Sequence, residues 1–419
     1  MGTRFCIASP ALPAARSIAV ASSVSPLAAK PSQFDEFEGL RKKTFLHDGA
    51  VASRQFVAQT SGIKMQAGHA SVVSGPSSAR GSSYALAMRR RPRRNRKGAA
   101  MRGMYRETTV GPENFILPLF IHDGDDNQPI SAMPGCFRLS REGLLKEVEG
   151  AYSEGIRAVV LFPKVPDNLK TSDGAECFNP DGIVPRTVRM LKEKFPELLV
   201  ITDIALDPYN SDGHDGIVDK TNGKIINDET VEQLCKQALC HAAAGADIVS
   251  PSDMMDGRIG AIRDALDGAG YTDVSILSYC AKYASAYYGP FRTALDSDPR
   301  FGDKTTYQMD PANVREALIE AELDLEEGAD MIMVKPGLPY LDVIKTLREN
   351  SPLPIAAYQV SGEYAMIKAA VANGWLDERK VVMESLIALR RAGADFILTY
   401  FARPASRWIA EDREAARKY

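Results

Sequence analysis

The sequence predicts an α/β protein folded as a (β/α)8 TIM barrel with an extended N-terminal arm. From about residue 114, apolar segments without polar alternation, as expected for strands buried on both faces, alternate with amphipathic helical segments. No strand is followed by a G-x-G-x-x-G or P-loop motif, which counts against a doubly wound sheet, the alternative for this pattern. We therefore divide the chain into a leader (1–85), an arm (86–113) and the barrel (114–419).

The leader has the composition of an organelle transit peptide. Residues 1–106 contain 18 Lys or Arg and only four acidic residues, a net charge of +14, whereas the rest of the chain carries −17. Residues 1–85 are rich in Ala, Ser, Gly and Arg, and they cannot bury enough apolar surface to offset chain entropy, so we expect disorder. The apolar stretch 18–24 is too short and too interrupted by serine for a secretory signal.

Composition also narrows the classes of partner. No apolar run approaches the ~20 residues that cross a membrane. The six cysteines form no CxxC pair, which indicates a reducing compartment. The basic run RRRPRRNRK (89–97) invites a nucleic-acid interpretation, but it lacks interleaved aromatic residues and precedes an acidic body. We predict neither a membrane nor a nucleic-acid partner, and we expect the arm to be solvated or to contact a second subunit.

Eight strands and at least five helices follow from the hydrophobic pattern. Three junctions repeat one formula, Ala-Gly-Ala-Asp or Glu-Gly-Ala-Asp, in which a glycine ends a helix and a buried strand follows (244–247, 327–330 and 392–395). The predicted strands are 115–121, 158–162, 199–206, 247–250, 275–279, 331–334, 355–360 and 396–400, and the predicted helices include 141–153, 230–244, 312–327, 340–349 and 379–392.

Polar side chains follow these strands at their carboxyl ends, where barrels of this class carry their function. One polar strand end is common, whereas several that converge on one rim are hard to explain as structure alone. In chain order they are Lys164, Asp203 and Asp207 with Asp215 in the following loop, Ser250, Lys282, Lys335, Tyr358 with Ser361, and Tyr400.

Two of these residues are lysines on adjacent strands. Lys335 ends the apolar run 331–334 and precedes Pro336 and Gly337, which stop the strand. Burial and the neighbouring charge of Lys282 would lower an amine pKa and make a neutral nucleophile that attacks a ketone or aldehyde. The alternative is a lysine that extends its charge into solvent from a strand end. Lys164 is a rival nucleophile at this stage.

The aspartates and the loop after Lys282 supply further candidates. Asp203, Asp207 and Asp215 offer oxygen ligands that suit Mg²⁺ better than Zn²⁺, although capping of a turn-rich loop explains them equally well. His214 in the same loop is expected to be solvated. The connection after Lys282 is about 28 residues long, a length typical of lids. It contains the segment YYGPFR (287–292) and residues that could together bind a carboxylate. These residues are Arg292 and, further along, Lys304 and Gln308.

Four motifs resemble those of the 5-aminolevulinate dehydratase family, also called porphobilinogen synthase. They are DPYNSDGHDG (207–216), SYCAKYASAYYGPFR (278–292), MVKPGLPYLD (333–342) and YQVSGEY (358–364), and the likeness covers roughly residues 88–415. The resemblance implies a barrel with an N-terminal arm, assembled as a homo-octamer. It also implies condensation of two molecules of 5-aminolevulinate to porphobilinogen, with loss of two waters, on the way to haem and chlorophyll.

The resemblance implies a role for each matching residue. Lys335 would form a Schiff base with the P-side substrate and Lys282 with the A-side substrate, which leaves Lys164 a structural role. The residues implied in substrate binding are Arg292, Lys304 and Gln308 at the A-side carboxylate, Ser361 and Tyr400 at the P-side carboxylate, and Tyr358, Ser250 and Asp203 along the site.

The metal-binding positions indicate the subtype. Animal-type members bind zinc through three cysteines, where this chain has Ala205, Asp207 and Asp215. The sequence therefore resembles the magnesium-dependent plant and alga branch, and the leader predicts a plastid (chloroplast) location. Glu320 matches the glutamate that holds an allosteric Mg²⁺ mainly through water in such relatives. The resemblance leaves open an active-site Mg²⁺ on Asp207 and Asp215.

Two other functions are weighed against this one. A Schiff-base aldolase acting on a phosphorylated sugar would need one lysine and a phosphate site on the last loops, and no Gly-rich loop lies there. A barrel that binds RNA through residues 89–97 would show salt-sensitive retention of RNA.

Overall fold

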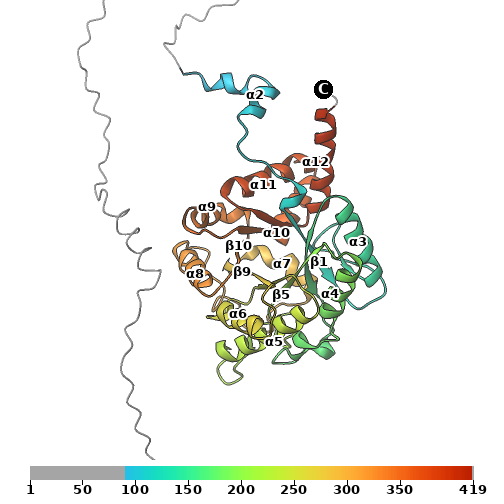
Figure 1. Cartoon of the computed structure of the whole chain (residues 1–419), viewed down its shortest axis with the longest axis vertical. Coiled ribbons are helices and arrows are strands. Elements are labelled where there is room, and N and C mark those ends of the chain that lie inside the picture. Colours follow the sequence, from blue (N-terminus) through green and yellow to red (C-terminus); the bar gives the residue numbers. More distant parts are fainter. Residues whose placement is uncertain (1–89, 418–419) are drawn as a thin grey trace, which may run out of the picture. The chain divides into compact units, whose positions relative to one another are not determined.

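The computed structural model describes residues 90–417. The predicted leader and the first four residues of the predicted arm lie outside the described residues. Eight parallel strands follow one another around a closed sheet, and pairing of the last strand with the first, Phe115 with Ile397, completes the circle. Helices surround this sheet (Figure 1). The predicted (β/α)8 barrel is confirmed.

The strands and helices agree with the predicted ranges to within a few residues. Around the barrel the strands are β1 (Phe115–Ile121), β4 (Ala158–Pro163), β5 (Leu199–Ile204), β8 (Ile248–Pro251), β9 (Ser275–Lys282), β10 (Met331–Lys335), β11 (Ile355–Gln359) and β12 (Phe396–Thr399). The helices outside them are α3 (Arg141–Ser153), α4 (Ile183–Lys194), α5 (Asn227–Ala243), α6 (Arg258–Gly268), α8 (Arg315–Glu326), α9 (Leu341–Asn350), α10 (Ser361–Ala372), α11 (Glu378–Ala392) and α12 (Ala402–Arg417).

The repeated Gly-Ala-Asp junctions have one structural task. Their glycines, Gly245, Gly328 and Gly393, have φ values of +100°, +99° and +129°, a region open to glycine at helix ends. Each following aspartate accepts a hydrogen bond from a strand amide on the neighbouring strand: Asp247 from Val200 N at 2.8 Å, Asp330 from Ile276 N at 2.7 Å and Asp395 from Ile355 N at 3.0 Å. The motif thus ends a helix and aligns two neighbouring strands at the amino end of the barrel.

Short additional elements decorate the barrel. Two two-stranded ribbons were not predicted from the sequence. The segment YYGPFR, predicted to be a loop, is helical instead, because proline is tolerated in the first turn of a helix. The first ribbon is β2 (Gln128–Pro129) with β3 (Phe137–Leu139), and it extends the barrel sheet because β3 also pairs with β1. The second, separate ribbon is β6 (Ile217–Val218) with β7 (Ile225–Ile226), and the helical segment comprises η5 (Ala286–Tyr288) and α7 (Gly289–Leu295).

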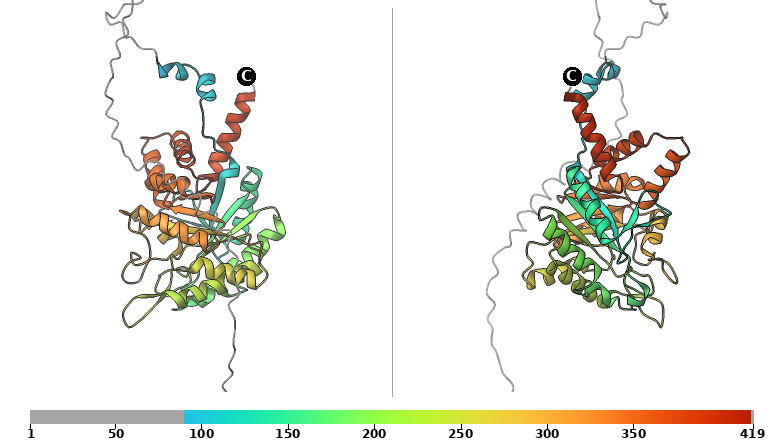
Figure 2. Two further views of the ribbon diagram at one scale, coloured as in Figure 1. Left: turned by 60° about the vertical axis from the view of Figure 1, so that its left-hand side comes forward. Right: turned by 90° about the vertical axis from the view of Figure 1, so that its right-hand side faces the viewer.

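The described part of the arm contains two short helices, η1 (Pro92–Arg96) and α2 (Ala99–Met104), neither of which has a buried residue. A third turn, η2 (Pro112–Asn114), leads into β1. The barrel helices and the C-terminal helix α12 are seen from two further sides in Figure 2. No helix within residues 90–417 is long and apolar enough to cross a membrane.

Candidate active site

Lys282 and Lys335 are direct partners in the barrel sheet. They are the last residues of β9 and β10, and the register of the two parallel strands pairs one with the other. Each keeps only 6% of its surface exposed. The adjacency predicted from strand order is therefore present, and both side chains start from the carboxyl end of the barrel.

Aromatic rings surround the amine of Lys335. Its Nζ lies 4.9 Å from the ring centres of Phe291 and Tyr358, 5.1 Å from that of Tyr279 and 5.2 Å from that of Tyr288. Ring faces attract an ammonium group, but they also exclude the water that would solvate it. Burial, followed by repulsion from Lys282, lowers the pKa of Lys335 to about 7. A large fraction of this amine is neutral at pH 7.

Lys282 has a different environment. Its Nζ lies 2.9 Å from Asp215 Oδ2 and also donates a hydrogen bond to the carbonyl oxygen of Ser252. Burial on its own raises the pKa of Asp215, but the nearby ammonium groups of Lys282 and Lys304 outweigh burial and hold that pKa well below its usual range. Asp215 is therefore an ionised counter-ion, and it keeps Lys282 in a salt bridge.

Lys304 shares the same carboxylate. Its Nζ lies 2.5 Å from Asp215 Oδ1 and 3.4 Å from Asp207 Oδ2. Burial lowers the pKa of Lys304, but the two aspartates outweigh burial and raise it. The structure therefore gathers Lys282, Lys304, Asp207 and Asp215 into one alternating cluster of charges.

The other predicted residues of the A side have unused polar groups. The side chain of Arg292, on α7, makes no hydrogen bond or ion pair within residues 90–417 and is half-buried. Gln308 is buried, and its Oε1 lacks a hydrogen-bond partner in the described part of the chain. A free guanidinium and a free amide oxygen near the charge cluster are groups that a polar ligand would satisfy.

On the P side, hydroxyl groups form two contacts. The hydroxyls of Tyr358 and Tyr400 lie 2.8 Å apart and are buried. The Oγ of Ser361 accepts a hydrogen bond from Phe291 N at 2.9 Å and is 3.4 Å from the carbonyl oxygen of Tyr287. The second contact is long, so the hydroxyl proton of Ser361 is weakly held and available for a better acceptor.

Asp203 and Ser250 lie at the ends of β5 and β8, where their strands pair. Burial raises the pKa of Asp203 to about 7, and its Oδ1 lacks a hydrogen-bond partner among the described residues. The Oγ of Ser250 donates a 2.7 Å hydrogen bond to the carbonyl oxygen of Leu277, so this hydroxyl is used within the sheet. Asp203 is therefore the more available of the two.

The carboxylates of the aspartate loop face lysine side chains in this structure. Both oxygens of Asp215 face lysine ammonium groups, and residues 90–417 contain no group of three or more His, Cys, Asp or Glu that could hold a metal ion. An active-site Mg²⁺ on Asp207 and Asp215 stays a prediction. The expectation that His214 is solvated is wrong: it is buried, with Nδ1 3.1 Å from Tyr307 Oη and Nε2 3.0 Å from the carbonyl oxygen of Phe301.

Glu320 lies on α8, the helix before β10, in the layer of helices outside the barrel sheet. Its carboxylate makes no hydrogen bond or ion pair within the described residues, although Arg258 is close enough to act on it electrostatically. Burial and the neighbouring Asp324 and Asp256 outweigh Arg258 and raise the pKa of Glu320 to about 7. An uncompensated, half-buried carboxylate of this kind is a group that a cation would stabilise.

The family model described as Delta-aminolevulinic acid dehydratase matches residues 89–408. The chain belongs to this dehydratase family. It is 66% identical over 329 residues to the chloroplastic delta-aminolevulinic acid dehydratase of Physcomitrium patens, covering 78% of this chain and 76% of the relative. It is 63% identical over 329 residues to the chloroplastic dehydratase 1 of Arabidopsis thaliana, covering 78% of this chain and 76% of that one.

A solved structure agrees with the family in sequence and fold. The crystal structure of delta-aminolevulinic acid dehydratase (porphobilinogen synthase) from Toxoplasma gondii in complex with the reaction product porphobilinogen is 58% identical to this chain. It superposes with a TM-score of 0.79 and covers 80% of this chain and 95% of its own. The dehydratase is thus a hydro-lyase that condenses two molecules of 5-aminolevulinate to porphobilinogen. Its plant relatives are named chloroplastic, which confirms the predicted plastid location.

Sequence reasoning missed several residues around the two lysines of the dehydratase. Tyr279, Tyr288 and the carbonyl oxygen of Ser252 contact them, and so does Phe291. Two of these rings stand in the YYGPFR segment, whose aromatic content was the available signal. Lys164, the rival nucleophile, makes no ion pair or side-chain hydrogen bond with any predicted site residue in the described part of the chain.

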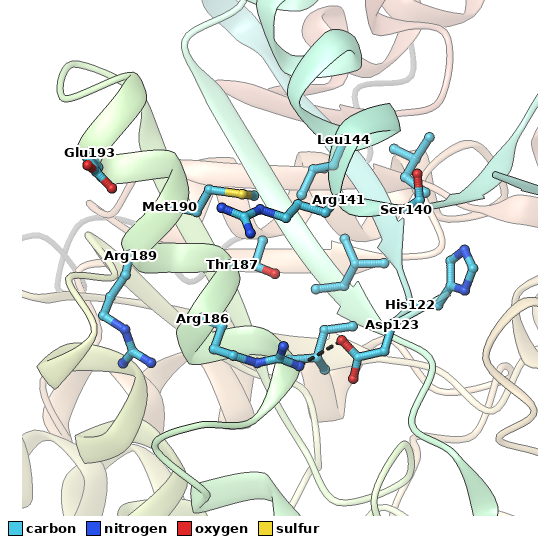
Figure 3. Close-up of a pocket in the computed structure, with 13 residues that line it drawn as sticks. His122, Asp123, Ser140, Arg141, Leu144, Arg186, Thr187, Arg189, Met190 and Glu193 are labelled. Atoms are coloured by element: carbon cyan, nitrogen blue, oxygen red, sulfur yellow. Dashed lines mark hydrogen bonds and ion pairs between the residues drawn. The ribbon is translucent and has the colours of Figure 1, made fainter. Parts of the chain in front are cut away.

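A separate cavity of about 450 Å³ lies between α3 and α4, beside the ends of β1 and β3. Figure 3 shows Arg141 reaching across it and an ion pair between Arg186 and Asp123, whose atoms are 2.7 Å apart. None of the predicted site residues of the dehydratase lines this cavity.

Proposed function

We propose that the dehydratase works through Schiff bases on both Lys335 and Lys282, one for each substrate molecule. The observation that carries this proposal is the strand register, which pairs two buried lysines at the carboxyl end of the barrel. A nucleophilic amine needs a neutral form, and two imines need two amines close together. No other pair of lysines at the described strand ends has this arrangement.

The different environments of the amines suggest an order of events. Lys335 reacts first, because its pKa of about 7 makes it largely available as the neutral amine. Its Nζ adds to the ketone carbon of one substrate, and the carbinolamine loses its hydroxyl group as water to leave the imine. Lys282 follows once its proton has left the salt bridge with Asp215.

The imines then supply the chemistry of condensation. A protonated imine accepts electrons from the neighbouring C–H bond, so that carbon becomes an enamine-like nucleophile and forms the C–C bond with the other substrate. An amine of one substrate then adds to the remaining imine carbon, and the lysine on that carbon leaves as the ring closes through the new C–N bond. The other lysine leaves as an amine by elimination, together with a proton from the neighbouring carbon, after the C–C bond has formed. Throughout, buried amines and carboxylates hold and return protons, for which the matched pKa values of Lys335 and Asp203 are suited.

Carboxylate recognition follows from the unused polar groups. The free guanidinium of Arg292, together with Lys304 and Gln308, would bind the carboxylate of the A-side substrate. Lys304 can do so without losing Asp215, because an ammonium group has three donors. Ser361 and Tyr400 would bind the P-side carboxylate through their hydroxyl groups, with Tyr358 orienting Tyr400 through their 2.8 Å contact.

Magnesium would bind at Glu320 rather than among the lysines. Mg²⁺ retains several waters and takes one or two carboxylate oxygens, which suits a single carboxylate that has no partner within the described residues. When bound, the ion would supply positive charge that keeps Glu320 ionised. No catalytic step is assigned to it.

The same helix supports assembly into a homo-octamer. Ile319 and Leu323, which lie one turn apart on α8, are 58% and 46% exposed, and the described arm helices have no buried residue. Apolar side chains in such positions are typical of subunit interfaces. An interface there would place a second subunit beside Glu320 and so beside its metal.

The test is borohydride trapping with 5-aminolevulinate, followed by mass mapping of peptides, after chelation and return of either Mg²⁺ or Zn²⁺. We expect adducts on Lys335 and Lys282, with turnover restored by Mg²⁺ and not by Zn²⁺. The absence of adducts, or an adduct on Lys164 alone, would refute the lysine assignment, and restoration by Zn²⁺ would refute the metal assignment.

A further inference from the structure

The carboxylate of Glu363 is buried in the first turn of α10 and accepts three backbone hydrogen bonds. Val360 N, at the start of its own helix, lies 2.8 Å from Oε2. The other two donors come from the turn directly after the catalytic lysine: Gly337 N lies 3.2 Å from Oε2 and Leu338 N lies 2.7 Å from Oε1. One side chain thus ties the end of β10 to the end of β11.

The turn after Lys335 is closely packed as well as hydrogen-bonded. A Cβ atom at Gly337 would lie 3.1 Å from the carbonyl oxygen of Tyr358 and 3.0 Å from Leu389 Cδ2, so a larger residue would displace the turn. On the other side, the hydroxyl of Tyr288 donates a 3.0 Å hydrogen bond to the carbonyl oxygen of Lys335. The backbone from the carbonyl group of Lys335 to Leu338 is therefore held by these contacts.

The first turn of α10 also holds the aromatic segment that encloses the amine. Ser361 accepts a hydrogen bond from Phe291 N, and a Cβ at Gly362 would lie 2.5 Å from the carbonyl oxygen of Tyr287. This close approach requires glycine. Three consecutive residues, Ser361 to Glu363, therefore contact both the backbone that carries Lys335 and the segment that carries Tyr288 and Phe291.

We propose that Glu363 is a positioning residue, which fixes the direction of Lys335 by holding the backbone turn that follows it. The proposal rests on the imine-forming role proposed for Lys335. Glu363 itself is not proposed to bind substrate, because both of its carboxylate oxygens already accept hydrogen bonds from backbone amides.

A carboxylate suits this task better than its amide. Three N–H groups converge on two oxygens, whereas glutamine offers one oxygen and an NH₂ group that would face another donor. Burial raises the pKa of Glu363 to about 7, against the lowering effect of the three amides. Glu363→Gln therefore keeps the size of the side chain while leaving at least one buried amide without an acceptor.

The experiment compares borohydride trapping in the wild-type protein, in Glu363→Gln and in a matched control, Glu378→Gln. Glu378 stands in the first turn of the next helix, α11, and forms an ion pair with Lys368 at 2.7 Å. This ion pair does not involve β10 or the turn after it. In Glu363→Gln we expect the ratio of Lys335 to Lys282 adducts, and kcat with it, to fall roughly tenfold to a hundredfold, the range typical of small misplacements of a reacting group. The control should keep the wild-type ratio.

The ratio separates positioning from general destabilisation, which would reduce both adducts together. If Glu363→Gln does not fold, Glu363→Asp is used, since it keeps the carboxylate but shortens the side chain by one methylene and so weakens its hydrogen bonds to the turn after Lys335. An unchanged adduct ratio in a folded variant would overturn the proposal. A wild-type protein without an adduct on Lys335 would instead overturn the assignment of that lysine.

Discussion

Lys335 and Lys282 are opposite each other in one sheet register, yet their surroundings differ in almost every respect. Lys335 is enclosed by four aromatic rings at 4.9–5.2 Å, and its pKa falls to about 7. Lys282 is held in a 2.9 Å salt bridge to Asp215. Strand register therefore brings the two amines together, whereas the rings and carboxylates contributed by the neighbouring strands and the segments after them give each amine a different environment.

The different surroundings of the two lysines reduce the repulsion between their amines. Two buried ammonium groups side by side would repel each other strongly at low dielectric. The structure supplies one shared carboxylate, Asp215, to Lys282 and Lys304, and leaves Lys335 to lose its proton. In the proposed mechanism Lys335 would therefore attack first, while Lys282 would remain paired with Asp215.

Removing the neutral amine should have the largest effect. In Lys335→Ala we expect turnover to fall by a factor of roughly 10³ or more, because the P-side imine cannot form. Folding should be retained, since the enclosing rings keep their own contacts. Steady-state assays and circular dichroism check both points, with Lys164→Ala as a control that keeps its activity. Substantial turnover in Lys335→Ala would show that the comparison assigns chemistry to the wrong amine.

Removing the shared carboxylate should have the next largest effect. Asp215→Asn leaves Lys282 and Lys304 without their counter-ion, and breaking a buried ion pair on one side costs about 3–5 kcal/mol. We expect the free energy of unfolding, from denaturant titration, to fall by about 3 kcal/mol. The control is Asp212→Asn, whose partner Lys220 has a 58% exposed side chain. That variant should lose less than about 1 kcal/mol. Equal losses in the two variants would mean that Asp215 is not the charge on which the cluster depends.

Much of the barrel could be predicted from the sequence, because most strands are rich in apolar residues and end at or next to a proline or polar residue. The strand predicted at 275–279 continues to Lys282 because Cys280 and Ala281 stay buried. The helix at Gly289–Leu295 could not be predicted, since Gly289 and Pro290 are typical of loops as well as of helix starts.

Less of the candidate active site could be predicted from the sequence than of the barrel. Adjacent strands imply adjacent lysines, so the pairing of Lys282 with Lys335 follows from strand order alone. The partner of Lys282 does not follow from strand order. Asp215 stands in an irregular loop, and the sequence places this loop near the rim without indicating the direction of the Asp215 side chain. An aspartate in such a loop suits a cation of either kind, and the structure places lysine ammonium groups there.

A variant at Glu320 tests whether the proposed metal site acts on the environment of Lys282 rather than on that of Lys335. Glu320 lies near Arg258, which is 3.4 Å from Asp253, the residue after the carbonyl that accepts from Lys282. In Glu320→Ala we expect the stimulation of turnover by Mg²⁺ to disappear, a loss of roughly fivefold to tenfold, within the usual range of coupling between sites. Glu322→Ala, an exposed neighbour on α8, should respond to Mg²⁺ like the wild type. Unchanged Mg²⁺ dependence in Glu320→Ala would refute the regulatory site.

The smallest expected effect tests the origin of the neutral amine. Only the neutral form of Lys335 attacks a ketone, so the initial rate of trapping at Lys335 should rise with pH through a midpoint near 7 and then level off. The charge of Asp203 raises the pKa of Lys335 and opposes burial. Asp203→Asn removes that charge, so the midpoint should move to lower pH by less than about one unit, since Asp203 is itself only partly ionised there. Adducts at Lys282 in the same samples provide the internal reference. A midpoint that stays fixed or moves upward would mean that the charge of Asp203 does not oppose burial at Lys335.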